Sequence, residues 1–139
     1  AFDADIISLG QKAVEEKMAE LEAKDKREAK EEELYVVLQL AWEMYIRGFT
    51  CLKVDLYRSK ADRFTMLPEE NAILPPFTAL GGLGSVDAHS LEEERENGEY
   101  SSVENMKKRT GITKTSVEAL RNHGCLDGMD ESDQLSLFG

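Results

Sequence analysis

Apolar residues recur at helical spacing at the start of the chain. Residues 3–23 carry Val14, Met18 and Leu21 on one face, which predicts an amphipathic helix. Gly10 weakens this pattern, but we do not expect it to end the helix.

The strongest apolar pattern lies in residues 34–47. Apolar side chains occupy nearly the whole circumference, and only Gln39, Glu43 and Arg47 form a polar stripe. A helix of this kind is expected to be deeply buried. The charged run before it, residues 24–33, is either an extension of the helix or a linker.

Residues 49–74 change to the β-branched and aromatic composition of strands, with partial alternation. We expect two or three short strands here, forming a small sheet that packs on the preceding helix. Pro75 and Pro76 end any strand at this point. The expected fold class is therefore mostly α-helical with a small β element.

Two shorter helices are expected after residue 100. Ser101 and Glu104 fit a capping box for a helix that runs to Arg109. Thr113 caps a second helix that ends at His123. In the last turn, His123 is expected to interact with the helix dipole, which is a structural role and not a catalytic one.

A glycine-rich hairpin, Leu80–Gly84, separates the expected sheet from these helices and reads Leu-Gly-Gly-Leu-Gly. Apolar helical patterns flank it on both sides, and Ala88 and Leu91 continue the inner face of the second helix. This is the pattern of a helix-hairpin-helix, a module that holds the DNA backbone without reading base sequence. One departure is Gly81, which stands where the motif often has Pro.

The hairpin has a physical reason to bind phosphate. Glycines allow backbone angles that a Cβ would forbid, so the turn exposes consecutive N–H groups at the start of the second helix. The helix dipole adds to the attraction of an anion. The residues that we expect to contact duplex DNA are Gly82, Leu83, Gly84, Ser85, Lys107, Lys108 and Lys114. The alternative is a glycine-rich turn that joins two packed helices in a protein-binding module.

The overall charge is at odds with this motif. The 139 residues carry a formal net charge of −11, whereas DNA-binding domains are usually basic. The acidic residues are unevenly spread, because five basic residues oppose only two acidic ones over residues 101–124. One face can therefore contact DNA. The glutamates at positions 92–94 must then point away from the duplex.

The sequence gives no indication of a catalytic or metal site. Cys51 and Cys125 lack the paired spacing of a zinc site and are expected to be reduced thiols. Asp55, Asp62 and Asp87 occur singly, without the paired carboxylates of a two-metal centre. We expect no catalytic residue, no metal ligand and no cofactor in this chain. No apolar run approaches the ~20 residues of a membrane span.

The last residues, 129–139, are short and polar and are expected to be disordered until bound. Gln134, Leu135, Leu137 and Phe138 resemble the motif by which bacterial polymerases and repair proteins attach to the sliding clamp. The alternative is a tail that folds back over its own domain.

From Leu34 to Phe138, the chain resembles the C-terminal region of the PolC-type replicative DNA polymerase III alpha subunit. Five blocks in this order carry the resemblance: AWEMYIRGF, VDLYRSKADRF, LPPFTALGGLG, RENGEYSSVENMKKRTGITKTSVEALRNHGCL and QLSLF. The resemblance implies a duplex-binding helix-hairpin-helix domain beside a clamp-binding motif.

This resemblance divides the chain into four parts. Residues 1–33 form a helix and charged linker from the preceding polymerase region, and residues 34–76 form the buried helix with the strands. Residues 77–128 form the helix-hairpin-helix DNA-binding region, and residues 129–139 form the clamp-binding tail.

The resemblance also implies partners and a location. Duplex DNA, the sliding clamp and the rest of the polymerase chain are the expected partners, in the cytoplasm and without a membrane. The parent would be a DNA-directed DNA polymerase with a 3′–5′ exonuclease and a need for magnesium, all outside this chain, so the enzyme status of the chain itself stays open. Two competing interpretations are a helical scaffold that binds only proteins and an accessory domain of a repair nuclease.

Overall fold

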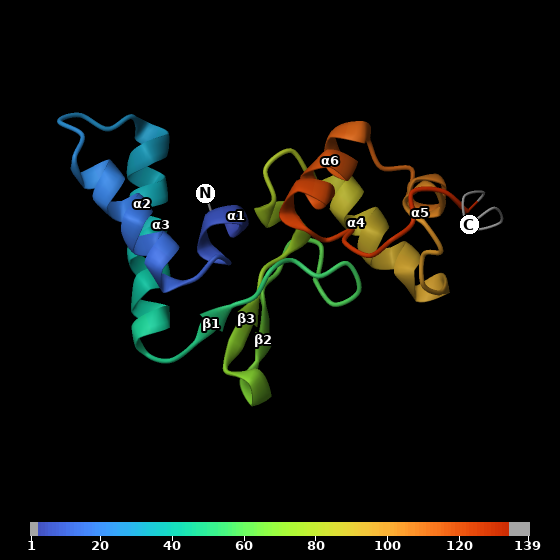
Figure 1. Ribbon diagram of the computed structural model, residues 1–139, viewed down its shortest axis with the longest axis horizontal. Helices are drawn as coiled ribbons and strands as arrows, with labels where there is room; N and C mark the ends of the chain where they lie inside the picture. Colours follow the sequence, from blue (N-terminus) through green and yellow to red (C-terminus); the bar gives the residue numbers. More distant parts are fainter. Residues whose placement is uncertain (1–2, 134–139) are drawn as a thin grey trace.

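The computed structural model describes residues 3–133, which form helices around a small sheet (Figure 1). The N-terminal helices are α1 (Ala4–Ile7), α2 (Gln11–Glu22) and α3 (Ala29–Ile46), and the strands are β1 (Thr50–Cys51), β2 (Thr65–Leu67) and β3 (Ala72–Leu74). The C-terminal helices are α4 (Ser85–Glu94), α5 (Val103–Thr110) and α6 (Lys114–His123), and three 3₁₀ turns are η1 (Pro68–Glu70), η2 (Phe77–Ala79) and η3 (Arg95–Asn97). The mostly helical fold class with a small β element is confirmed.

The first expected helix is in fact two helices, α1 and α2. Gly10 adopts φ 111°, a conformation that L side chains rarely reach, and becomes the N-cap of α2. The prediction that Gly10 does not end the helix was therefore wrong. The side chain of Asp3 caps α1 by accepting from the N–H groups of Asp5 and Ile6.

The charged run is divided between a turn and a helix. Helix α3 begins at Ala29, five residues before the expected start, because Glu28 and Glu31 form a reciprocal capping box. Helix α3 packs antiparallel to α2, since the indole N–H of Trp42 donates to Glu15 at 3.0 Å and the Tyr35 hydroxyl donates to Glu22.

Helix α3 is not deeply buried, contrary to the prediction. Only Leu38 and Ala41 are buried, whereas Leu40 is 63% exposed, Ile46 54% and Val36 53%. Helix α2 and strand β1 contact only part of its circumference, and the remainder of the apolar surface faces outward.

The small sheet has the strand order β1-β3-β2, with β1 parallel and β2 antiparallel to the central strand. The expectation of two or three short strands is confirmed. Cys51 of β1 is buried in one cluster with Leu38 and Ala41, which attaches the sheet to α3. Strand β3 ends at Leu74, directly before Pro75.

Two hydrophobic clusters form the core. One lies among α1, α2, α3 and β1, and the other surrounds α4, α5 and α6. Helix α1 contributes to both, through Ile7 in the first cluster and Ala4 in the second. The α2–α3 pair and the α4–α6 group consequently stand on either side of α1 in Figure 1.

The region after α6 departs from the expected disordered tail. The carbonyl of Asp130 accepts from Val103 N–H at 2.8 Å, and that of Glu131 accepts from Glu104 N–H at 3.0 Å. Met129 packs against the second cluster. Residues 129–133 are thus docked on the start of α5, because they satisfy amides that a helix N-terminus leaves open.

Candidate nucleic-acid interface

The glycine-rich hairpin joins η2 to α4. Gly82 has φ 90°, and a Cβ on it would lie 3.2 Å from the Thr115 methyl of α6. A side chain there would be strained and crowded, which explains the glycine. Leu80 and Leu83 on either side are buried.

The prediction of a helix before the hairpin was wrong, because η2 is a single 3₁₀ turn. Pro75 and Pro76 hold the chain extended up to Phe77, and too few residues then remain before Leu80 for an α-helical turn. The inner face after the hairpin agrees with the prediction, since Ala88 and Leu91 are fully buried.

The hairpin leaves the start of α4 without a cap. Gly84 is the N-cap of α4, and among residues 3–133 no side chain hydrogen-bonds to the first amides of this helix. By contrast, Ser102 caps α5 and Thr113 caps α6 with side-chain oxygens. The expected capping box at Ser101 was wrong by one residue, because Ser102 accepts from Asn105 N–H at 2.9 Å. The sequence prediction placed the phosphate contact at the amides of Leu83, Gly84 and Ser85. The Leu83 part was wrong, because its N–H donates to the Leu80 carbonyl at 3.2 Å, which leaves the amides of Gly84 and Ser85.

The three lysines expected to contact DNA are all exposed. Lys114 is the first residue of α6 and directly precedes Thr115, whose methyl group lies next to Gly82. Lys107 and Lys108 lie in the last turn of α5, away from the first hairpin in sequence. Lys108 pairs with Glu104 at 3.4 Å, an exposed pair of small energetic value.

The three glutamates at the end of α4 do not lie at the hairpin. The Glu92 carboxylate accepts from Ala61 N–H at 2.9 Å, and Glu94 pairs with Arg109 at 3.2 Å. Glu93 is exposed. With a rise of about 1.5 Å per residue, Glu92 lies about 10 Å along the axis of α4 from Ser85.

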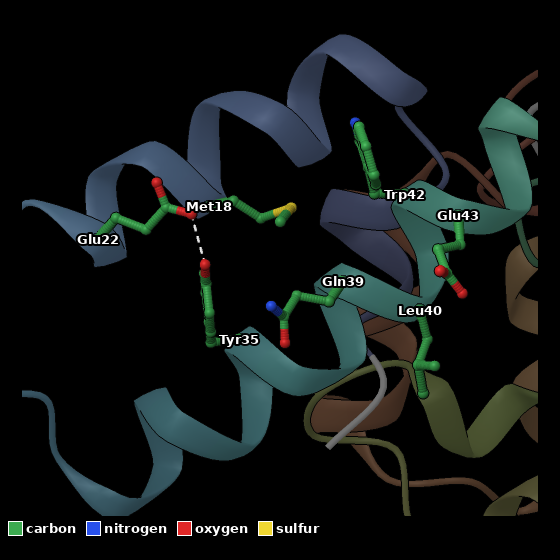
Figure 2. A pocket seen from close by; sticks show the side chains of 7 residues that line it. All are labelled: Met18, Glu22, Tyr35, Gln39, Leu40, Trp42 and Glu43. Carbon is green, nitrogen blue, oxygen red and sulfur yellow. Dashed lines mark hydrogen bonds between the residues drawn. The ribbon is translucent and has the colours of Figure 1, made fainter.

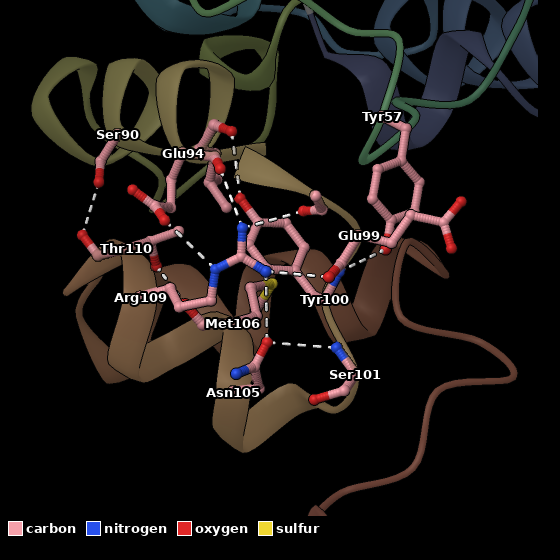
Figure 3. A network of polar contacts seen from close by, with 12 residues as sticks. Tyr57, Ser90, Glu94, Glu99, Tyr100, Ser101, Asn105, Met106, Arg109 and Thr110 are labelled. Atoms are coloured by element: carbon pink, nitrogen blue, oxygen red, sulfur yellow. Dashed lines mark hydrogen bonds and ion pairs between the residues drawn. The ribbon is translucent and has the colours of Figure 1, made fainter. Parts of the chain in front are cut away.

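Arg109 makes its contacts within the protein, between α4 and α5, and is not available to DNA (Figure 3). Its guanidinium donates to three backbone carbonyls, those of Glu94 at 3.0 Å, Gly98 at 2.9 Å and Glu99 at 2.9 Å. It also lies over the Tyr100 ring, 4.6 Å from the centroid. Arg109 therefore connects the end of α4 to α5. It does not contribute to the basic surface that the sequence indicated for residues 101–124.

A second hairpin, which the sequence reasoning missed, joins α5 to α6. It repeats the first at an offset of 29 positions, from Gly82 to Gly111. Gly111 also has positive φ, at 69°, and Thr113 occupies the N-cap position that Gly84 holds in the first hairpin. The corresponding buried pairs are Leu83 and Ile112, Ala88 and Val117, and Leu91 and Leu120.

The similarity between the two hairpins is visible in the sequence. A glycine followed by an apolar residue precedes two further apolar positions at the same distances in both hairpins. Thr113 replaces the last glycine, so the second copy lacks the glycine cluster that marked the first.

Outside the hairpins, the described residues give no candidate catalytic or metal site. A hollow of about 450 Å³ between α2 and α3 is lined by Met18, Glu22, Tyr35, Gln39, Leu40, Trp42 and Glu43 (Figure 2). Among residues 3–133, no group of three His, Cys, Asp or Glu side chains could hold a metal ion. None of the helices in this range is long and apolar enough to cross a bilayer.

Comparison with known proteins agrees with this geometry. A family defined by the helix-hairpin-helix motif matches residues 48–135, more than half of the chain. The chain therefore belongs to the helix-hairpin-helix family.

Over its full length, the chain is homologous to a segment of PolC-type DNA polymerase III. It is 48% identical to the DNA polymerase III PolC-type of Clostridium perfringens over 139 residues. It is 43% identical to that of Caldanaerobacter subterraneus and 41% to that of Bacillus subtilis, each over 138 residues and 99% of this chain. The chain spans about a tenth of the length of these relatives (10%).

Proposed function

We propose that this chain is the duplex-DNA-binding segment of a PolC-type replicative DNA polymerase. The observation that carries the proposal is the uncapped start of α4 at the Leu80–Gly84 hairpin, in a chain homologous to a polymerase segment. The amides of Gly84 and Ser85 hold one phosphate. The Leu83 N–H donates to the Leu80 carbonyl at 3.2 Å and helps to shape the turn together with Gly82. Lys114 adds positive charge beside it, and Lys107 and Lys108 add charge further along the module. Such contacts are independent of base sequence.

Gly84→Asp tests the hairpin without disturbing the fold. Gly84 has φ −83° and ψ 173°, which any residue adopts, and nothing lies within 4 Å of a Cβ placed on it. Asp is a favourable N-cap, so the helix should be at least as stable. The carboxylate of the new Asp would accept hydrogen bonds from the amides at the start of α4, and its charge would repel phosphate. We expect duplex binding about tenfold weaker or more, because hydrogen bonds to a charged group contribute about 1.5–3 kcal/mol.

Fluorescence anisotropy with a labelled duplex, at two salt concentrations, measures this change. Ser101→Asp is the matched control, since it adds the same charge at an exposed position at the far end of α5. Equal affinities for the two variants would reject the hairpin as the phosphate site. Binding that does not weaken with salt would reject phosphate contact altogether.

Clamp attachment is a separate proposal. Gln134, Leu135, Leu137 and Phe138 lie outside the described residues, so it rests on their sequence alone. Replacing both Leu137 and Phe138 with Ala should abolish binding to purified sliding clamp, because the apolar anchors are lost. Ser136→Ala, directly before Leu137, should bind like the unaltered chain. Unchanged clamp affinity in the double variant would reject the proposal.

The remaining properties belong to the parent polymerase. We propose that DNA-directed DNA synthesis, a 3′–5′ exonuclease, a need for magnesium and a cytoplasmic location belong to that parent polymerase, and that this chain contributes grip and not chemistry. A protein-binding scaffold, the first competing function, predicts no duplex binding. A repair-nuclease accessory domain, the second, also predicts duplex binding, and the similarity to PolC-type polymerases favours the polymerase proposal over it.

A further inference from the structure

The two hairpins differ in what occupies the start of their second helix. Asp87 lies in the first turn of α4, and its Oδ2 reaches across to α6. This oxygen accepts from the Thr113 N–H at 3.1 Å, the Thr113 hydroxyl at 3.1 Å and the Ser116 hydroxyl at 2.5 Å. Three donors at the N-terminus of α6 are thus directed at one carboxylate oxygen.

Thr113 holds the position in the second hairpin that Gly84 holds in the first. Its amide is therefore the counterpart of the amide that would bind phosphate in the first hairpin. We propose that Asp87 fills the phosphate position of the second hairpin, so that the protein holds a duplex through the first hairpin alone. This inference rests on the proposed DNA binding.

The arrangement is not reciprocal. The counterpart of Asp87 at the same offset is Ser116, a neutral side chain that donates to Asp87 and makes no bond to the start of α4. Within residues 3–133, one helix of the pair therefore receives an internal anion, while the start of α4 receives no side-chain acceptor.

The carboxyl of Asp87 is suited to remain ionised. Burial acts to raise its pKa, but the hydrogen bonds from Ser116 and Thr113 together outweigh burial and hold the pKa below its ordinary value. A permanent negative charge at Thr113 would repel a second phosphate as well as occupy its donors.

A titration with duplex DNA followed by amide NMR tests this in the unaltered chain. The N–H signals of Gly84 and Ser85 should shift with the binding curve, whereas that of Thr113 should stay in place because its donor is taken. A Thr113 shift as large as that of Gly84, at the same DNA concentrations, would overturn the inference.

Variants at Asp87 give a second, independent measurement. Asp87→Ala removes both the charge and the acceptor, and should open a second phosphate contact. Asp87→Asn removes the charge but keeps an acceptor oxygen for Thr113. Glu93→Gln removes one charge from an exposed site on the same helix, outside both hairpin sequences.

The slope of log affinity against log salt separates these variants. We expect Asp87→Ala to be steeper than Asp87→Asn and Glu93→Gln by roughly 0.9, the value for one more phosphate contact. If the unaltered chain binds DNA and all three variants have equal slopes, the inference is overturned. If the unaltered chain shows no salt-dependent binding at all, the proposed function fails instead. Should Asp87→Ala not fold, the NMR titration decides alone.

Discussion

His123 shows how a single buried side chain joins distant parts of the chain. It is 4% exposed at the end of α6, where its Nε2 accepts from Val54 N–H at 3.0 Å. Its Nδ1 lies 2.6 Å from the carboxylate of Asp5 in α1 and carries the proton of the neutral ring. Sequence analysis predicts a structural role for His123 at the helix dipole, and the contacts of its ring cross to α1 and to the segment after β1.

Replacing His123 with Ala should therefore destabilise the protein. The buried Val54 N–H would lose its acceptor, which costs about 1–3 kcal/mol. Urea denaturation measures the free energy of unfolding. Asn122→Ala, at the exposed neighbour, should change stability by less than about 0.5 kcal/mol. Similar losses in both variants would contradict the role given to His123.

His89 gives DNA binding a dependence on pH. It lies one turn after Ser85, and donation to the Ser85 carbonyl at 2.8 Å, followed by the charges of Asp62, Glu92 and Glu93, raises its pKa above the ordinary 6.5. The added proton places a positive charge near the first hairpin. Duplex affinity should fall as pH rises from about 6 to about 8, through the raised pKa of His89.

Measuring affinity across this range in His89→Gln isolates the contribution of the ring. The variant should bind with the same affinity at both ends of the range. A variant with the full pH dependence of the unaltered chain would assign the effect to another group.

At the scale of elements, the sequence predicts best where local signals act alone. Thr113 and Gly124 bound α6 as expected, because a cap and a positive-φ glycine decide the ends of a helix without help from the rest of the fold. Helix α3 shows the opposite case. Its apolar circumference predicted burial, but the number of neighbours that cover a helix depends on packing, which periodicity does not report.

The first hairpin was found from the sequence while the second was missed, for a similar reason. Gly82 and Gly84 form a visible cluster, whereas Gly111 stands next to Ile112 and Thr113. The proposed occupation of the phosphate position in the second hairpin depends on Asp87, which lies far from that hairpin in sequence. Only the packing of α4 against α6 shows that contact.

Arg109 separates a structural cation from a DNA-binding one. Arg109→Lys keeps the charge, but an ammonium cannot reach three carbonyls in the fork geometry of a guanidinium. We expect a loss of about 1–3 kcal/mol in the free energy of unfolding, with no change in the salt slope of duplex binding. Lys114→Ala should do the reverse, with unchanged stability and a slope shallower by roughly 0.9. Chemical denaturation and the duplex titration together distinguish the two, and a shallower slope in Arg109→Lys would contradict the assignment.

At the scale of the whole molecule, the two hydrophobic clusters are joined through few links. Helix α1 supplies one buried residue to each, and His123 bonds to Asp5 of that helix. Proteins often open in units that follow such divisions. The two hairpins and the docked residues 129–133 belong to the α4–α6 side, whereas the exposed apolar face of α3 belongs to the other. The module that we assign to DNA therefore has its own core.

The two cysteines can report on this division, because one lies in each part. Cys51 is buried with α3, and Cys125 packs against the α4–α6 cluster and donates to the Val54 carbonyl at 3.2 Å. Burial raises the pKa of each thiol to about 12, so neither is reactive when folded. Thiol labelling in rising urea should expose both at one concentration in the unaltered chain. In His123→Ala, Cys125 should become reactive at lower urea than Cys51, because the lost bonds loosen the α4–α6 side and its link to α1. Cys51→Ser and Cys125→Ser assign each signal, and reactivity that still appears together in His123→Ala would mean that the two clusters unfold as one unit.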